Sequence, residues 1–164
     1  MIFQARCDGV AIALAIAQLA SAVACQVSRS DEPRELVSEI SHRRTECYGS
    51  CPAYSVVFRA DGTALFEGRA NVSPLGSYRG VISREAFDRL VALSDEARFF
   101  ELRPMYRARV TDNPTRFTRI VRGNRPKEVE AYGSGAPPGL VKLETALESI
   151  RRDIPWVAVA DGGK

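Results

Sequence analysis

The alternation of apolar and polar residues is clearest around Asp61-Gly62. Every second residue from Tyr54 to Phe58 is apolar, and another apolar run follows the Asp-Gly pair. Asp-Gly between two such runs predicts a β-hairpin. A three-residue loop pairs Val56 with Phe66 and keeps one face of the hairpin apolar, whereas a two-residue turn pairs Val56 with Glu67. The pattern therefore favours the three-residue loop.

Further strands and two helices follow from the same kind of pattern. The other predicted strands lie at residues 36–44, 76–82, 117–121 and 128–132. Apolar residues at helical spacing predict one helix after Ser83, a good N-cap residue, and another that opens with Pro137-Pro138. The predicted buried positions of the two helices are Phe87, Leu90, Val91, Ser94 and Ala97, then Leu140, Leu143, Leu147 and Ile150.

These elements follow one another in the order strands, helix, strands, helix. The order indicates an α+β domain, with an antiparallel sheet of hairpins and both helices packed on one face. We place this single domain at residues 36–157, with Trp156 folded back onto the sheet, and a frayed tail at 158–164. Arg151 and Arg152 stand at the end of the second helix, where the helix dipole favours cations.

The first 24 residues have the composition of an export signal. Val10 to Ala17 is continuously apolar, and the apolar run resumes after Gln18. The stretch is shorter than the roughly 20 residues that span a bilayer, and it ends in Ala22-Val23-Ala24, the small-x-small pattern of a cleavage site. We therefore predict a signal peptide at residues 1–24.

Cys25 directly follows the predicted cleavage site. This arrangement resembles the bacterial lipobox, in which the thiol is acylated and becomes the mature N-terminus, although Ala22 stands where that pattern usually has leucine. Residues 25–35 then form a polar tether. We expect a protein of the periplasm or outer membrane that contacts the membrane through the lipid on Cys25. The alternative is a soluble periplasmic or secreted protein cut by the ordinary signal peptidase.

Composition narrows the possible functions. The chain has 164 residues, 45% of them hydrophobic, with 23 basic and 20 acidic side chains. This is enough for one hydrophobic core and excludes a disordered chain. A net charge of +3 is too small to indicate a nucleic-acid partner, and none is predicted. Arginines on the predicted strands leave a basic sheet face as an alternative, formed by Arg59, Arg69, Arg116, Arg119 and Arg122.

Export divides the four cysteines among different roles. Cys7 leaves with the signal peptide and Cys25 is the acylation site, so Cys47 and Cys51 remain as a pair. In an oxidising compartment such a pair forms a disulfide, which fixes the loop tip between them. A thioredoxin-like redox pair has two intervening residues rather than three, and a zinc site needs two further ligands, for which His42 is the only imidazole. We expect no metal and no cofactor.

Four residues are candidates for ligand binding: Arg43, Arg44, Tyr48 and Asp112. Arg43 and Arg44 carry the guanidinium groups of an anion clamp; the competing interpretation is a solvated or ion-paired surface pair. Asp112 precedes Asn113-Pro114, where an aspartate ordinarily bonds its own backbone. His42 has no identifiable partner nucleophile, so we predict a strand-face residue and no catalytic group.

The segment from Arg44 to Tyr54 follows the pattern Arg-Thr-x-Cys-x-Gly-x-Cys-Pro-x-Tyr. It resembles the signature of an uncharacterised bacterial domain family of unknown function, whose members are small exported proteins and often lipoproteins. The resemblance extends over residues 37–157 and departs in the arginine-rich stretch at 116–125. It implies export and a single domain, and it supplies no catalytic residue.

These observations together predict a non-enzymatic domain of the cell envelope, tethered by lipid, that binds a protein or another envelope component. One alternative is a module that binds a small anion around the disulfide loop. A second alternative is a thiol–disulfide enzyme that uses Cys47 and Cys51.

Overall fold

The computed structural model describes residues 35–159. The predicted signal peptide, the acylation site at Cys25 and the tether up to residue 34 lie outside the described residues. Within residues 35–159, no helix is both long enough and apolar enough to cross a bilayer.

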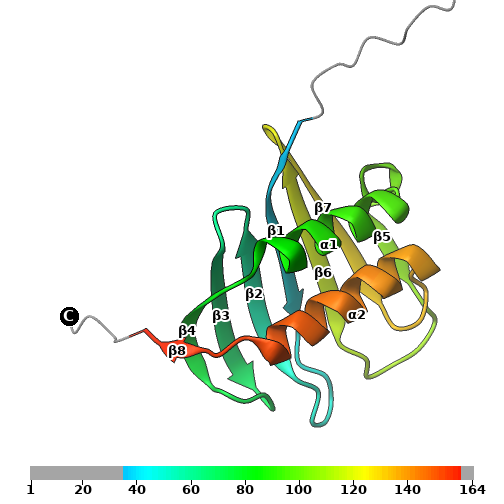
Figure 1. The fold of residues 1–164 in the computed structure, drawn as a ribbon. Helices are drawn as coiled ribbons and strands as arrows, with labels where there is room; N and C mark the ends of the chain where they lie inside the picture. Colours follow the sequence, from blue (N-terminus) through cyan, green and yellow to red (C-terminus); the bar gives the residue numbers. More distant parts are fainter. Residues whose placement is uncertain (1–34, 160–164) are drawn as a thin grey trace, which may run out of the picture. The chain divides into compact units, whose positions relative to one another are not determined.

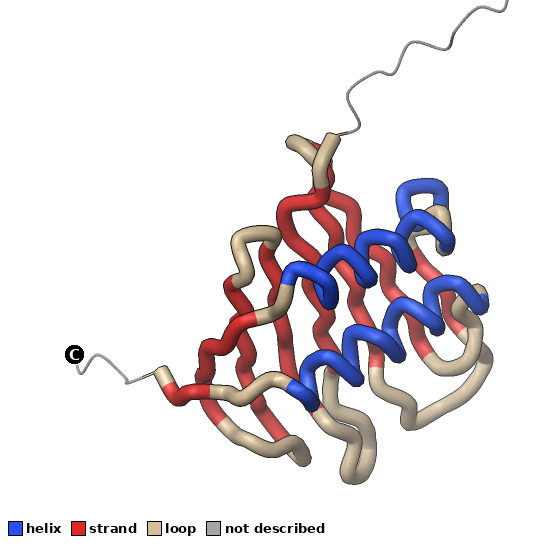
Figure 2. The backbone as a smooth tube through the Cα atoms, in the orientation of Figure 1, coloured by secondary structure: helices blue, strands red, loops and turns tan. Residues whose placement is uncertain are grey.

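One sheet and two α-helices make up the described part of the chain. The strands are β1 (Val37–Arg44), β2 (Ala53–Arg59), β3 (Thr63–Ala70), β4 (Gly76–Val81), β5 (Met105–Arg107), β6 (Thr115–Arg122), β7 (Arg125–Tyr132) and β8 (Val157–Ala158). The helices are α1 (Arg84–Glu96) and α2 (Pro138–Asp153), and a 3-10 turn, η1 (Phe99–Glu101), follows α1. Both helices lie over the same face of the sheet (Figures 1 and 2). The predicted α+β class is confirmed.

The sheet has the strand order β5-β7-β6-β1-β2-β3-β4-β8 and is not built from hairpins alone. β5 pairs in parallel with β7, so the prediction of a wholly antiparallel sheet is wrong at this edge. At the other edge β8 pairs with β4, Val157 opposite Arg79, and Val159 N–H donates to Ser77 O at 3.0 Å. The predicted frayed tail therefore starts too early. Strands of three and two residues are too short to show an alternating pattern.

The β2–β3 hairpin has the predicted register. Phe58 lies opposite Ala64 and Val56 opposite Phe66, and Gly62 adopts the left-handed φ of 89° that closes the three-residue loop. Glycine suits this position because it carries no Cβ.

The core lies between the sheet and the two helices. Ser83 caps α1 as predicted, accepting a hydrogen bond from Ala86 N–H at 3.2 Å. The buried face of α1 includes Leu93, which the predicted stripe omitted, whereas Val91 is only partly buried. The apolar buried positions of α2 include the predicted leucines at 140, 143 and 147, each fully buried.

The last segment covers the end of the core that the helices leave open. Trp156 packs against Phe66, with 5.2 Å between ring centroids, and its Nε1–H donates to Arg151 O at 2.9 Å. A Cβ added at Gly80 would lie 2.4 Å from Ile154 Cγ2 and 3.2 Å from the Trp156 ring. β4 therefore needs glycine at this position for the segment after α2 to close over the sheet.

We expect Gly80→Ala to lower the free energy of unfolding by about 1–3 kcal/mol, because the added methyl overpacks a contact that has no room. Chemical denaturation followed by the fluorescence of Trp156, the only tryptophan of the chain, measures both the stability and the local change. Ser77→Ala, an exposed position on the same strand, is the matched control. Equal stability of the two variants would contradict the packing argument.

Candidate functional site

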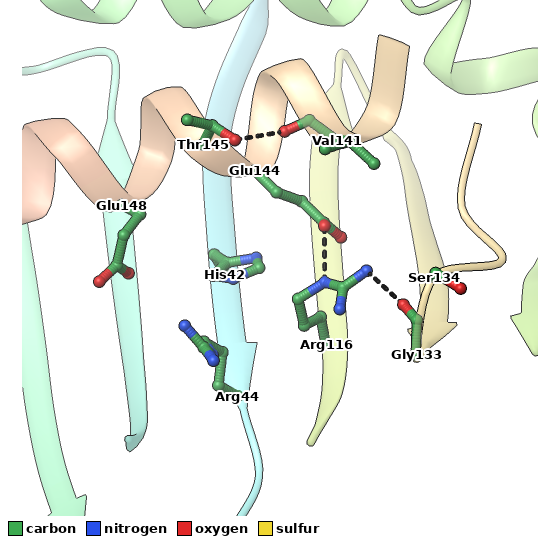
Figure 3. Close-up of a pocket in the computed structure, with 9 residues that line it drawn as sticks. All are labelled: His42, Arg44, Arg116, Gly133, Ser134, Val141, Glu144, Thr145 and Glu148. Atoms are coloured by element: carbon green, nitrogen blue, oxygen red, sulfur yellow. Dashed lines mark hydrogen bonds and ion pairs between the residues drawn. The ribbon is translucent and has the colours of Figure 1, made fainter. Parts of the chain in front are cut away.

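A pocket of about 460 Å³ opens between α2 and the sheet, near the end of β1. Figure 3 shows side chains rising from the sheet toward two glutamates that point down from α2. The lining residues are His42, Arg44, Arg116, Gly133, Ser134, Val141, Glu144, Thr145 and Glu148. Pockets that hold small ligands measure roughly 300 to 1,000 Å³.

Strand alternation explains why polar residues gather under α2. Ile40 is part of the core on the helix side of β1, so His42 and Arg44, at the same parity, face that side too. The register then places Arg116 of β6 beside Arg44 and Thr118 beside His42.

Glu144 is the first of two acids that α2 brings to this polar row. It is 6% exposed and accepts from Arg116 Nε at 2.7 Å and from the Thr118 hydroxyl at 3.4 Å. Arg116 also donates to Gly133 O at 3.1 Å, which ties the loop after β7 to the site. Burial raises the pKa of Glu144 above its ordinary value, although the Arg116 guanidinium and the Thr118 hydroxyl act in the opposite direction.

Glu148, one turn further along α2, holds the second polar cluster. The Tyr54 hydroxyl donates to it, and Arg151 Nη2 donates to its Oε1 at 2.9 Å. Burial raises the pKa of Glu148, but the hydrogen bonds from Arg151 and Tyr54 outweigh it and leave this pKa below 4.5. Burial also raises the pKa of the Tyr54 hydroxyl, and its hydrogen bond to the Glu148 carboxylate adds to that shift.

Arg151 is therefore a core residue and more than a cation at the end of a helix. It is 6% exposed, and its guanidinium carbon lies 4.7 Å from the Tyr54 ring centroid and 5.4 Å from that of Phe66. The prediction from the helix dipole placed the residue correctly at the end of α2 but missed its burial.

His42 lies on the helix-facing side of β1, where it lines the pocket and is buried. It is 2% exposed, and its Nδ1 lies 3.1 Å from the Thr118 hydroxyl. Burial lowers the pKa of His42 to about 3; nearby arginines, including Arg44, contribute to this shift, and Glu148 acts in the opposite direction. The imidazole is therefore neutral at physiological pH.

The two candidate arginines lie on opposite faces of the sheet. Arg43 stacks on the Phe117 ring, 3.7 Å from its centroid, while Arg44 lines the pocket. A clamp that uses both is excluded, because neighbouring residues of a strand point to opposite sides. Within residues 35–159, Arg44 ion-pairs with no carboxylate, and its buried Nε has no hydrogen-bond partner.

The loop between β1 and β2 is closed by a Cys47–Cys51 disulfide, with 5.5 Å between the two Cα atoms. Thr45 fastens the start of this loop: its N–H donates to Thr115 O at 3.0 Å and its hydroxyl accepts from Thr115 N–H at 2.9 Å. Tyr48, at the tip, is 92% exposed. The loop thus presents an uncovered aromatic side chain on a fastened backbone.

The other sequence candidates lie apart from the pocket or in ion pairs. Asp112 is exposed, with a left-handed φ of 61°, and the side-chain bond within its turn is made by Asn113 Nδ2 to Thr111 O at 2.9 Å. The alternative of a basic sheet face does not hold, because its five arginines divide between the two sides of the sheet and each forms an ion pair with an acid. The pairs are Arg59–Glu39, Arg119–Glu39, Arg69–Glu67, Arg116–Glu144 and Arg122–Asp95.

Sequence reasoning did not find the two glutamates that line the pocket, Glu144 and Glu148, nor the residues that bond them, Thr118 and Tyr54. It named Arg116 only as part of the alternative basic face. One signal was available. Glu144 and Arg151 share the buried stripe of α2 with Leu140 and Leu147, at steps of three and four residues. Charged residues at such positions need buried partners.

We expect Glu148→Gln to lower the free energy of unfolding by about 3 kcal/mol at pH 7, because it leaves buried Arg151 without its carboxylate. A folded-state pKa below 4.5 means that the ionised carboxylate stabilises the fold above pH 4.5 and that this contribution disappears as the pH falls through the lower folded value. The loss of unfolding free energy caused by Glu148→Gln should therefore be smaller in acid, as measured by urea unfolding between pH 7 and pH 3.

Glu144→Gln is the matched comparison, one turn away on the same helix. Its raised pKa gives the opposite sign: protonated Glu144 stabilises the fold at pH 4.5 and below, and this contribution is lost as the pH rises through the higher folded value. The cost of Glu144→Gln should be smaller at pH 7 than at pH 4. The same pH trend for both variants would refute the assigned environments.

Comparison with known proteins gives a family but no activity. No curated protein matches the chain. The family model described as "Domain of unknown function (DUF6438)" matches residues 38–151, which include every residue that lines the pocket. This chain therefore belongs to the DUF6438 family of domains of unknown function.

Proposed function

We propose that this protein is an exported, non-enzymatic binding module of the cell envelope, held to a membrane by a lipid on Cys25. The observation that carries the proposal is that the fastened loop and the pocket share one end of the sheet. β1 ends at Arg44, which lines the pocket, and the chain continues directly into the loop at residues 45–52. We call this loop and the adjoining pocket the binding end.

The direction of β1 supports the tethered arrangement. β1 starts with Val37 at the opposite end of the sheet from the binding end (Figure 1). A lipid on Cys25 precedes β1 in the chain, so attachment enters the domain at one end while the binding end is at the other.

The disulfide supports export. Bonds of this type persist in the periplasm and outside the cell and are rare in the reducing cytosol. The Cys47–Cys51 bond closes the loop that carries Tyr48, so the shape of the binding end depends on an oxidising compartment.

The pocket chemistry supports binding rather than catalysis. A general base needs a pKa near the working pH, and burial keeps the pKa of His42 at about 3. Tyr54 and both glutamates are engaged in hydrogen bonds within the domain. Groups that hold the fold together in this way are suited to shaping a site for a ligand.

The first test is the intact mass of the protein recovered from the membrane fraction of an expressing bacterium. We expect a chain that begins at Cys25, carries added acyl groups and lacks two hydrogens because of the Cys47–Cys51 bond. Cys25→Ser is the control and should abolish the acylated species. An uncut chain in the cytosolic fraction, with both thiols free to titrate, would overturn the proposal.

The second test addresses the loop. An exposed tyrosine on a rigid backbone is a typical hot spot, and its truncation costs on the order of 2 kcal/mol of binding, about thirtyfold in affinity. We expect Tyr48→Ala to weaken binding of the isolated domain to immobilised envelope extract by this factor.

Leu36→Ala is the matched control for this test, because Leu36 is 83% exposed and precedes β1 at the opposite end. It should bind like the wild type. If both variants retained the same components of the extract with wild-type affinity, the loop would have no part in binding.

A further inference from the structure

The proposed binding function can be narrowed to a class of ligand. Resting on that function, we propose that the pocket binds the carboxylate of an organic ligand with an apolar body, and that Arg44 is the residue that binds this carboxylate.

Arg44 is the one pocket arginine that the described chain leaves unmatched. Arg116 is paired with Glu144, and Arg151, behind the pocket, with Glu148. Arg44 ion-pairs with no acid in residues 35–159, and its Nε is inaccessible to solvent without a hydrogen-bond partner. Buried donors almost always have an acceptor, and a buried donor of a charged group is especially costly to leave unmet. An anion that binds the exposed part of the Arg44 guanidinium supplies the charge partner that residues 35–159 do not provide.

The charge of the site favours an anion with a single charge. The pocket is lined by two cations, Arg44 and Arg116, and two carboxylates, Glu144 and Glu148. A third cation, buried Arg151, pairs with Glu148. His42 adds no charge because it is neutral at physiological pH. The difference, three minus two, is one positive charge, which one carboxylate neutralises. A phosphate dianion would bring excess negative charge beside two glutamates and is disfavoured.

The walls of the pocket favour an organic group next to that carboxylate. Val141, on α2, lines the pocket and remains 44% exposed, and Thr145 turns its hydroxyl back to Val141 O at 2.8 Å. The donor of this hydroxyl is thus occupied, and Val141 offers apolar contact on the wall that also carries Glu144 and Glu148. At about 460 Å³ the pocket also has more room than an inorganic ion requires.

Arg44 is the group that gives the selectivity. A guanidinium offers two parallel N–H donors to the two oxygens of a carboxylate, which an amide of the same shape cannot match. A free small acid and the C-terminal carboxylate of a peptide present this same chemistry, so both are included in the test.

The test titrates the domain, residues 25–164 with the disulfide intact, with hexanoate, hexanamide and inorganic phosphate, followed by NMR of the arginine Nε–H signals and by calorimetry. A leucine-rich tripeptide with a free C-terminus, and the same tripeptide amidated, complete the series. We expect the acids to bind and to shift the Arg44 Nε–H signal, and their amides and phosphate to bind at least about tenfold more weakly.

Arg44→Gln should weaken binding of the acids by at least about tenfold. Arg43→Gln is the matched control, because it alters the neighbouring guanidinium on the opposite face of β1, and it should bind like the wild type. Thermal unfolding checks that both variants fold, and the Arg44 signal of the wild type gives a readout that needs no variant.

Three results would overturn the assignment: equal binding of acids and amides, tighter binding of phosphate than of the acids, or no shift of the Arg44 signal at saturating hexanoate. None of these results affects the membrane-fraction mass or the Tyr48 comparison. A failure of the carboxylate assignment is therefore distinguishable from a failure of the proposed function.

Discussion

The domain depends on the pairing of charges that α2 buries against the sheet. Glu144 and Arg151 are each 6% exposed, and charges at that depth are tolerated only with close partners. Arg116 and Thr118 of β6 donate hydrogen bonds to Glu144. Tyr54 of β2 and Arg151 both donate to Glu148, which is the carboxylate partner of Arg151. Two strands on either side of β1 thus fix where α2 lies. A shift of the helix by one turn would separate both sets of partners at once.

The same pairing produces the pocket. Because polar residues occupy the helix-facing positions at the end of β1, apolar contact between α2 and the sheet is interrupted there. Further along the same strands, Ile40, Phe58 and Ile120 are fully buried and the contact is continuous. One part of the contact between α2 and the sheet is therefore a continuous apolar core, and the other part is polar and lines the pocket. This division begins with the alternation of side chains along β1, which places His42 and Arg44 on the side facing α2 and Arg43 on the opposite side.

The sequence is informative where the determining interactions are local. The register of the β2–β3 hairpin, the Ser83 cap and the leucine stripe of α2 all follow from residues close together in the chain, and all were predictable. The site is formed by pairs that are far apart, such as Tyr54–Glu148 and His42–Thr118, and composition gives no rule for matching them. The edge strands β5 and β8 were missed because they are held by their neighbours and not by a pattern of their own.

The disulfide loop and the pocket are parts of one segment. Only Thr45 and Glu46 separate Arg44 from Cys47, and Thr45 is bonded through both its N–H and its hydroxyl to Thr115, next to Arg116. Closing the loop at Cys47–Cys51 restrains the chain that follows Arg44, and the Thr45–Thr115 bonds restrain its neighbouring strand. The backbone at Arg44 is paired with β2 and β6, and the crosslinked loop begins three residues later. The strand pairs and the Thr45–Thr115 bonds hold Arg44 independently of the disulfide, which constrains the loop that carries Tyr48.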